Sequence, residues 1–488
     1  MSTVEHQAVP RVSAAPGRQP RSALVGQLCA AVVWLVAAWL IGSVHFMTGA
    51  VLFCVAPFVV LAVGRRIVRQ PFLMIDPLLT FAASFAVFFL AGLVSLGSGS
   101  GLRYASVGDI DEPFVLATVA QLAVIVVVMV LPCRAWPPPV SVPTVPTALS
   151  LRRMSLFAQG LVAGSLGGTV LTVVQAGGIG SAVEILTAHN KALTDSLGDS
   201  AGRSAWALFA FPACVALSGL LFVDGVPKRA RRLYATEFGG ILLLGLVLYG
   251  SRLLLTLALV GLAATYCCLN RRPIRWWMVA SIGLLIMLIS IPLLSERTGT
   301  SSATSGEDVT DIVGYGIFDI SIASVVVEDE LGEKMRDPYR LALAAGSVVP
   351  LVGVQAEDLN PVRLDSLVAQ HIDGGDLRRG TITGFPPSLP TALLVTFGLA
   401  GALAVGFVFG RLASAADRWL LRVHDRRRSA ITGFWYALTV TMLFNAFKDG
   451  DVLINMAGFA KNAIVLAALY AAVVLVTTQR GAARYDFR

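Results

Sequence analysis

Apolar and polar positions alternate in long blocks along this chain of 488 residues. Twelve apolar blocks approach or reach the roughly 20 residues that an α-helix needs to cross a bilayer. They cover residues 23–43, 46–63, 77–97, 114–133, 155–175, 205–223, 236–250, 253–269, 277–294, 390–410, 431–447 and 454–477. The pattern therefore predicts an all-α polytopic membrane protein with about 12 transmembrane helices.

Basic residues gather in every second polar segment between these blocks. Arg65, Arg66 and Arg69 follow the second block, and four basic residues lie within 228–232. Cytoplasmic loops carry such an excess of positive charge, so both termini are predicted to be cytoplasmic. The resulting division is a disordered cytoplasmic tail at 1–22, spans one to nine at 23–294, a large extracytoplasmic loop at 295–389, spans ten to twelve at 390–477, and a cytoplasmic tail at 478–488.

The large loop before the tenth span is predicted to fold. Loops longer than about 15 residues are usually functional or disordered. This loop contains apolar stretches at 312–327 and 339–354, which favour short amphipathic helices lying over the bundle. A smaller extracytoplasmic loop is expected at 176–204.

Composition excludes several classes of protein. Hydrophobic residues make up 56% of the chain and charged residues 14%, which is too little charge for the surface of a soluble protein. The net charge of +8 is explained by basic residues in the cytoplasmic loops of a membrane protein. No nucleic-acid partner is therefore predicted. All six cysteines lie in apolar blocks, so neither a disulfide nor a cysteine metal site is expected. No phosphate-binding glycine motif is present, and no cofactor is predicted.

Arginines on the predicted outer side suit a phosphate or pyrophosphate, because guanidinium groups bind such oxygens bidentately. Arg252 stands between two apolar blocks, near membrane depth, where an unpaired charge is costly and a functional role is the default hypothesis. The alternative is that loop arginines simply solvate the loop or pair with its acids. The basic residues singled out as candidate contacts are Arg203, Arg252, Arg340, Arg363, Arg378, Arg379 and Lys461.

A histidine in the large loop is the candidate general base, because its unperturbed pKa lies near 6.5. His371 has arginines close in sequence and is preferred to His189 in the smaller loop. Asp319 and Glu328 are acidic alternatives. The acids at 109–112 could hold a divalent cation, but three acids in a short exposed loop are common and no metal is assigned.

Three local patterns and the topology resemble the Wzy-type O-antigen polymerases, which are oligosaccharide repeat-unit polymerases. The first pattern is Gly250-Ser251-Arg252 before an apolar run. The second runs from Tyr339-Arg340 through Gly346 to Pro350. The third joins residues 383–388 to 397–401, at the end of the large loop and the following span. Arg363 and Gly374 also have the RX10G spacing described for loop arginines of this family.

The resemblance implies an inverting, metal-independent transfer outside the plasma membrane of a bacterium. A growing oligosaccharide on undecaprenyl pyrophosphate would pass to a sugar hydroxyl of another lipid-linked repeat unit. Arg252 and His371 would be catalytic, and the other basic residues would bind pyrophosphate or glycan. The partners would be polyprenyl-pyrophosphate-linked oligosaccharide, membrane lipid and a chain-length regulator.

Three other interpretations remain open from the sequence. An O-antigen ligase would share the topology and donor, although the residues around His371 differ from the ligase pattern. A flippase or secondary transporter would be expected to show internal repeats, which are not evident. A transferase that uses a polyprenyl-monophosphate sugar would carry carboxylates in the first outer loop, and residues 43–45 hold none.

Overall fold

The computed structural model describes residues 19–97, 110–131, 137, 148–180, 201–247, 252–278, 316–346, 364, 367–368, 387–427 and 430–485. All regular secondary structure within these ranges is helical. Seven of the described helices are long and apolar enough to cross a membrane, and two shorter apolar helices cover Leu208–Phe222 and Leu254–Asn270. The protein is therefore an all-α polytopic membrane protein, as the apolar blocks predicted.

Helices lie over eleven of the twelve predicted spans. They are α1 (Gln19–Gly42), α2 (Phe46–Ile67), α3 (Pro77–Gly97), α4 (Glu112–Val130), α5 (Ala148–Gln175), α8 (Ala201–Phe222), α9 (Lys228–Val247), α10 (Arg252–Asn270), α18 (Leu389–Arg427), α19 (Ala430–Asp449) and α20 (Val452–Tyr485). The ninth predicted span, 277–294, lies outside the described residues except for its first two positions. The count of twelve crossings stays a prediction.

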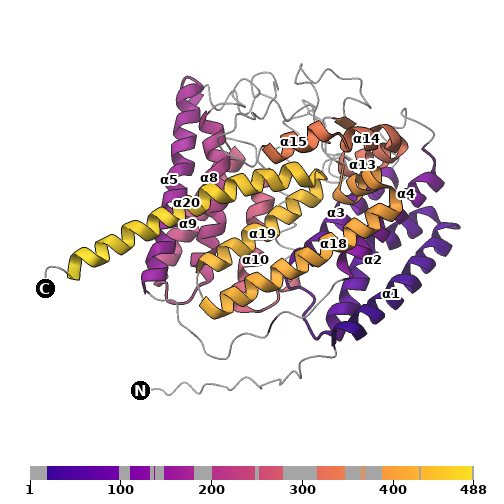
Figure 1. Cartoon of the computed structure of the whole chain (residues 1–488), viewed down its shortest axis with the longest axis horizontal. Coiled ribbons are helices and arrows are strands. Elements are labelled where there is room, and N and C mark those ends of the chain that lie inside the picture. The colour runs from indigo at the N-terminus through magenta and orange to yellow at the C-terminus, as the bar shows by residue number, and fades with distance from the viewer. Residues whose placement is uncertain are drawn as a thin grey trace.

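Two hydrophobic cores meet near the middle of the bundle. One core joins α1 to α4 with parts of α18 and α19, and the other joins α5, α8, α9 and α10 with other parts of α18 and α19 and with α20. In Figure 1, α1 to α4 lie on the right and α5, α8 and α9 on the left. Within the first core, the Phe81 ring centroid of α3 lies 5.7 Å from those of Phe409 and Phe447. Ile75 packs against both cores.

The outer faces of the bundle are apolar. Val33 and Val36 of α1, Val170 of α5 and Leu475 of α20 are all more than half exposed. A soluble protein rarely leaves such contiguous apolar surface in water. These faces are where lipid acyl chains would contact the protein.

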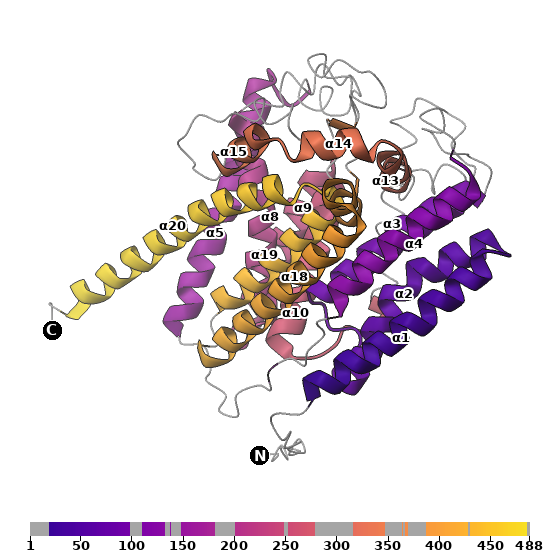
Figure 2. The same cartoon turned by 45° about the vertical axis from the view of Figure 1, so that its right-hand side comes forward.

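Within residues 316–346 of the large loop, short helices lie at one end of the bundle: α13 (Gly316–Val326), α14 (Glu328–Met335) and α15 (Pro338–Gly346) (Figure 2). The prediction of short helices in this segment is confirmed. However, α13 is more deeply packed than an amphipathic helix lying on the surface, because Phe318 inserts against Phe89 at 5.6 Å between ring centroids. Leu331 and Met335 of α14 join a small third core with Val395 of α18.

Helix α18 changes conformation at Gly398, where φ is 64° and ψ is 174°. Only glycine adopts this combination readily. The nine residues before Gly398 pack under the loop helices, whereas the residues after it continue as the long helix of Figure 1. The span predicted at 390–410 is thus two helical segments joined at a glycine.

Replacing Gly398 with alanine should destabilise the protein by about 1–3 kcal/mol. No atom lies within 4 Å of the position that the new Cβ would take, so the effect would come from the backbone alone. The matched control is Gly239→Ala in α9, which also meets open space but has helical geometry; it should be neutral or stabilising, by up to about 1 kcal/mol. Thermal unfolding of the two variants in the same detergent measures the difference. Equal melting temperatures for the two would contradict the assignment of strain to Gly398.

Candidate functional site

A buried ion pair connects the loop helices to the last transmembrane helix. Arg340 of α15 donates from Nη2 to Asp451 Oδ2 at 2.6 Å and from Nη1 to the Met335 carbonyl oxygen at 3.2 Å. Both charged side chains are more than nine-tenths buried. We expected Arg340 to contact a pyrophosphate, and the structure places its guanidinium against protein acceptors. It therefore serves to hold α15 at the start of α20.

The Asp451 carboxylate accepts hydrogen bonds from several segments of the chain. Its Oδ2 also accepts a hydrogen bond from the Leu364 backbone N–H at 3.1 Å, and its Oδ1 accepts one from Ile454 N–H at 3.4 Å in the first turn of α20. Gly450, with φ of 63°, makes the turn between α19 and α20. A Cβ at Gly450 would overlap the Pro387 carbonyl oxygen, so the chain that leads into α18 is packed directly against this turn.

A cavity of about 260 Å³ lies beside this turn, between α8, α10, α19 and α20. Its size falls just below the roughly 300–1,000 Å³ of typical small-molecule sites. The walls combine apolar side chains with four polar ones, which are Thr441, Asn445, Asn455 and Asn462. Asn445 donates to Asn455 at 2.9 Å, and Asn455 donates to the Asp451 carbonyl oxygen at 2.8 Å. The cavity and the ion pair thus share one hydrogen-bonded chain.

Three of the predicted basic residues belong to helices that line this cavity, although none of them is a lining residue. Arg252 is the first residue of α10, and Leu257, five residues later, lines the cavity. In α8, Arg203 likewise precedes the lining residue Leu208 by five. Five residues of helix advance about 8 Å along the axis. Lys461 of α20 is exposed and adjoins the lining residue Asn462.

Several predicted residues lie outside the described part of the chain. They are His189, Arg363, His371, Arg378 and Arg379. Leu364, which follows Arg363 in sequence, is described and bonds to Asp451 as given above. Of the acidic alternatives, Asp319 belongs to α13. Glu328 begins α14, where partial burial and then the neighbouring Asp329 raise the pKa of its carboxyl above the usual range.

The acidic segment at 109–112 has a structural explanation in its described residues. The Asp111 carboxylate accepts a hydrogen bond from the Phe114 N–H at 2.8 Å and caps the N-terminus of α4. Asp109 lies outside the described residues. Among the residues that the structure describes, no three His, Cys, Asp or Glu side chains are grouped as a metal site would need.

A second buried polar network occupies the opposite end of the bundle. Arg65 of α2 pairs with Asp76 at 2.6 Å and donates to the carbonyl oxygens of Phe72 and Met74. The Tyr436 hydroxyl of α19 donates to Asp417 of α18 at 2.7 Å and lies 3.2 Å from the carbonyl oxygen of Ile75. The network therefore ties the 68–76 loop to α2 and α19 directly, and to α18 through the Tyr436–Asp417 bond.

Sequence reasoning missed both networks. It treated Arg65 only as one of several positive charges between apolar blocks, and it gave Asp451 no role. Asparagines within the apolar blocks at 431–447 and 454–477 were a usable signal, because polar side chains at membrane depth usually have a partner or a function. Three of them line the cavity.

Comparison with known proteins gives no relative. No family model, no curated protein and no solved structure matches the chain.

Proposed function

We propose that this protein is an extracytoplasmic glycan polymerase. It would transfer a growing oligosaccharide from undecaprenyl pyrophosphate to a lipid-linked repeat unit in the plasma membrane of a bacterium, with both termini in the cytoplasm. The observation that carries the proposal is the amide-lined cavity beside the Arg340–Asp451 pair. It lies at the end of the bundle that the distribution of basic loops assigns to the outside, next to the loop helices.

The lining of the cavity suits a sugar. Asparagine side chains offer two donors and an acceptor to sugar hydroxyl groups. Phe211 and Phe459 add apolar surface to the same cavity, and aromatic rings pack against the C–H faces of sugars. The volume admits part of an oligosaccharide, with the rest extending toward the loop helices.

The chemistry needs a stabilised leaving group and a base. A sugar hydroxyl of the acceptor attacks the anomeric carbon of the donor, a new C–O bond forms, and the bond to the pyrophosphate oxygen breaks. Arginine side chains stabilise the negative charge that develops on the pyrophosphate. Arg252 and Arg203, at the starts of two cavity-lining helices, are proposed for this role. The hydroxyl proton passes to the base, for which His371 is proposed.

A lipid-linked substrate also needs access from the bilayer. Helix α20 contributes Ile454, Asn455, Gly458, Phe459, Asn462 and Leu466 to the cavity. The same helix exposes Leu453, Met456 and Ile464. One wall of the cavity is therefore a helix whose other face is apolar and exposed, which would let a polyprenyl tail stay in lipid while its pyrophosphate enters.

The test of the proposal is a deletion strain whose lipid-linked glycans and surface polymer are analysed by mass spectrometry. We expect long polymer to vanish and single repeat units to accumulate on the outer leaflet. Full-length lipid-linked polymer would instead indicate a ligase. Single units held on the inner leaflet would indicate a flippase. Either of the last two outcomes would overturn the polymerase proposal.

Filling the cavity gives a sharper test of its role. Gly458 lines the cavity, and no atom lies within 4 Å of the position that its Cβ would take. Gly458→Leu should therefore occupy the cavity without disturbing the packing of helices. We expect the yield of long polymer to fall by about tenfold or more, as for the loss of a substrate-positioning contact.

The matched control for this variant is Gly167→Leu in α5, an exposed position that also meets open space and does not line the cavity. Complementation of the deletion strain, with membrane abundance measured by immunoblot, compares the two variants. Equal polymer length from both, at equal abundance, would remove the cavity from the site.

A further inference from the structure

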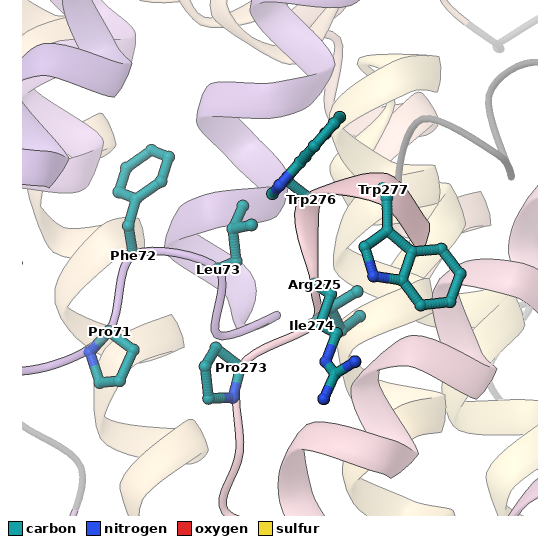
Figure 3. Close-up of a pocket in the computed structure, with 8 residues that line it drawn as sticks. All are labelled: Pro71, Phe72, Leu73, Pro273, Ile274, Arg275, Trp276 and Trp277. Atoms are coloured by element: carbon teal, nitrogen blue, oxygen red, sulfur yellow. The ribbon is translucent and has the colours of Figure 1, made fainter.

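A surface pocket of about 370 Å³ lies at the other end of the bundle, away from the proposed reaction. Two loops form it, one after α2 and one after α10 (Figure 3). The first loop contributes Phe72 and Leu73, and the second contributes Arg275, Trp276 and Trp277 together with prolines from both. Its lining is aromatic and aliphatic, with one guanidinium group.

The pocket is built on a fixed backbone. The Ile274 N–H donates to the Leu73 carbonyl oxygen at 3.0 Å, which holds the two loops together. From below, the buried Arg65 donates to the carbonyl oxygens of Phe72 and Met74, and its guanidinium lies 5.9 Å from the centre of the Phe72 ring. Contacts within the protein therefore hold the backbone of both loops that form the pocket.

The pocket exposes large aromatic side chains, whose contact with water is unfavourable. Trp276 is 74% exposed and Trp277 is 46% exposed. Tryptophan is enriched at the level of lipid headgroups, where its ring contacts apolar material and its N–H contacts polar groups. These loops connect the ends of transmembrane helices, so the two rings lie where the bilayer surface is expected.

Positive charge surrounds the pocket. Arg66 in the last turn of α2 is exposed, and so are Arg69, Arg272 and Arg275 on the two loops. Residues 271–277 contain no acid, and the acid that ends the first loop, Asp76, is buried against Arg65. In Figure 3 the Arg275 guanidinium and the Trp276 ring extend to opposite sides of their loop. One side thus offers cations and the other an apolar surface.

We propose that this pocket binds an anionic phospholipid of the cytoplasmic leaflet. The lipid phosphate pairs with Arg275 and Arg272, and the upper part of an acyl chain packs against Phe72, Trp276 and Trp277. Basic residues close to a membrane surface attract anionic lipids in this way. The bound lipid sets the depth of the loops that the Arg65 network fixes.

The experiment uses the full-length protein in detergent, in a background where the exposed Trp39 and Trp419 are replaced by phenylalanine. Phosphatidylglycerol with brominated acyl chains is titrated, and tryptophan fluorescence is measured against brominated phosphatidylcholine. We expect phosphatidylglycerol to quench at a lower mole fraction. This preference should vanish in Trp276→Phe/Trp277→Phe.

Charge variants test the headgroup contact. Arg272→Gln/Arg275→Gln should raise the phosphatidylglycerol needed for half-quenching by about tenfold or more. The control, Arg229→Gln/Arg232→Gln, removes the same charge from exposed positions in the first turns of α9 and should leave the titration unchanged. The proposal is overturned if both lipids quench alike or if the two double variants behave alike. It is also overturned if soluble glycerol phosphate relieves the quenching, because the pocket would then take the phosphate without the lipid.

Discussion

Arg65→Ala should lower the free energy of unfolding by about 3–5 kcal/mol, the usual effect of removing one partner of a buried ion pair. The substitution would leave the Asp76 carboxylate buried without its cation. It would also leave the carbonyl oxygens of Phe72 and Met74 without their donor. The loop that joins α2 to α3 would lose the contacts that hold it against α2, while the bond from Tyr436 of α19 to the Ile75 carbonyl oxygen would remain. Thermal unfolding of the purified protein, followed by size-exclusion chromatography, measures the effect.

The neighbouring residue provides the control for this prediction. Arg66 carries the same charge but is exposed, so Arg66→Ala should change stability by less than about 0.5 kcal/mol. The double variant Arg65→Met/Asp76→Asn should recover much of the lost stability, because it removes the unpaired charge. The asparagine side chain could still accept the Leu79 N–H bond that Asp76 accepts at the start of α3. Equal melting temperatures for the Arg65 and Arg66 variants would show that the buried pair contributes little.

Asp451→Ala should have the largest combined effect on stability and activity. It leaves the buried Arg340 without its carboxylate, which costs about 3–5 kcal/mol. It also removes the acceptor of the Leu364 N–H. Because α15 would no longer be held beside the cavity, we expect long polymer to be lost even where folded protein remains. Polymer length in the complemented deletion strain and melting temperature of the purified variant are the two measurements.

The cap at the start of α20 must be separated from the ion pair. Asp111 caps α4 from an exposed position and forms no described ion pair, so Asp111→Ala measures the loss of a cap alone, about 1 kcal/mol. Arg340→Met/Asp451→Asn keeps a capping side chain and removes both charges. If this double variant is as stable as the wild type but makes no long polymer, the pair contributes to the reaction through position. If Asp451→Ala behaves like Asp111→Ala in both measurements, the pair has no special role.

Hydrophobic blocks determined the fold class and the positions of most helices. A helix that crosses a bilayer needs about 20 apolar residues. These residues are consecutive, so each span can be recognised from its own segment of the sequence. Eleven predicted blocks coincide with helices for that reason. Helices α13 and α15 were likewise indicated by the apolar stretches at 312–327 and 339–354, whereas the charged α14 between them was not. Hydropathy could not indicate the break at Gly398, because the break depends on how the preceding segment packs beneath the loop helices.

Only the tertiary structure shows which residues distant in sequence form hydrogen bonds and ion pairs with each other. Arg340 and Asp451 are 111 positions apart, and Tyr436 lies 361 positions from Ile75. Periodicity reports which face of a helix is buried, but it does not report which helix lies opposite. Sequence alone placed Arg340 among candidates for binding a pyrophosphate, because an arginine in a loop and an arginine in a buried pair look the same in one chain. The burial that turns it into a link between α15 and α20 arises only when the helices assemble, since desolvation depends on every neighbour at once.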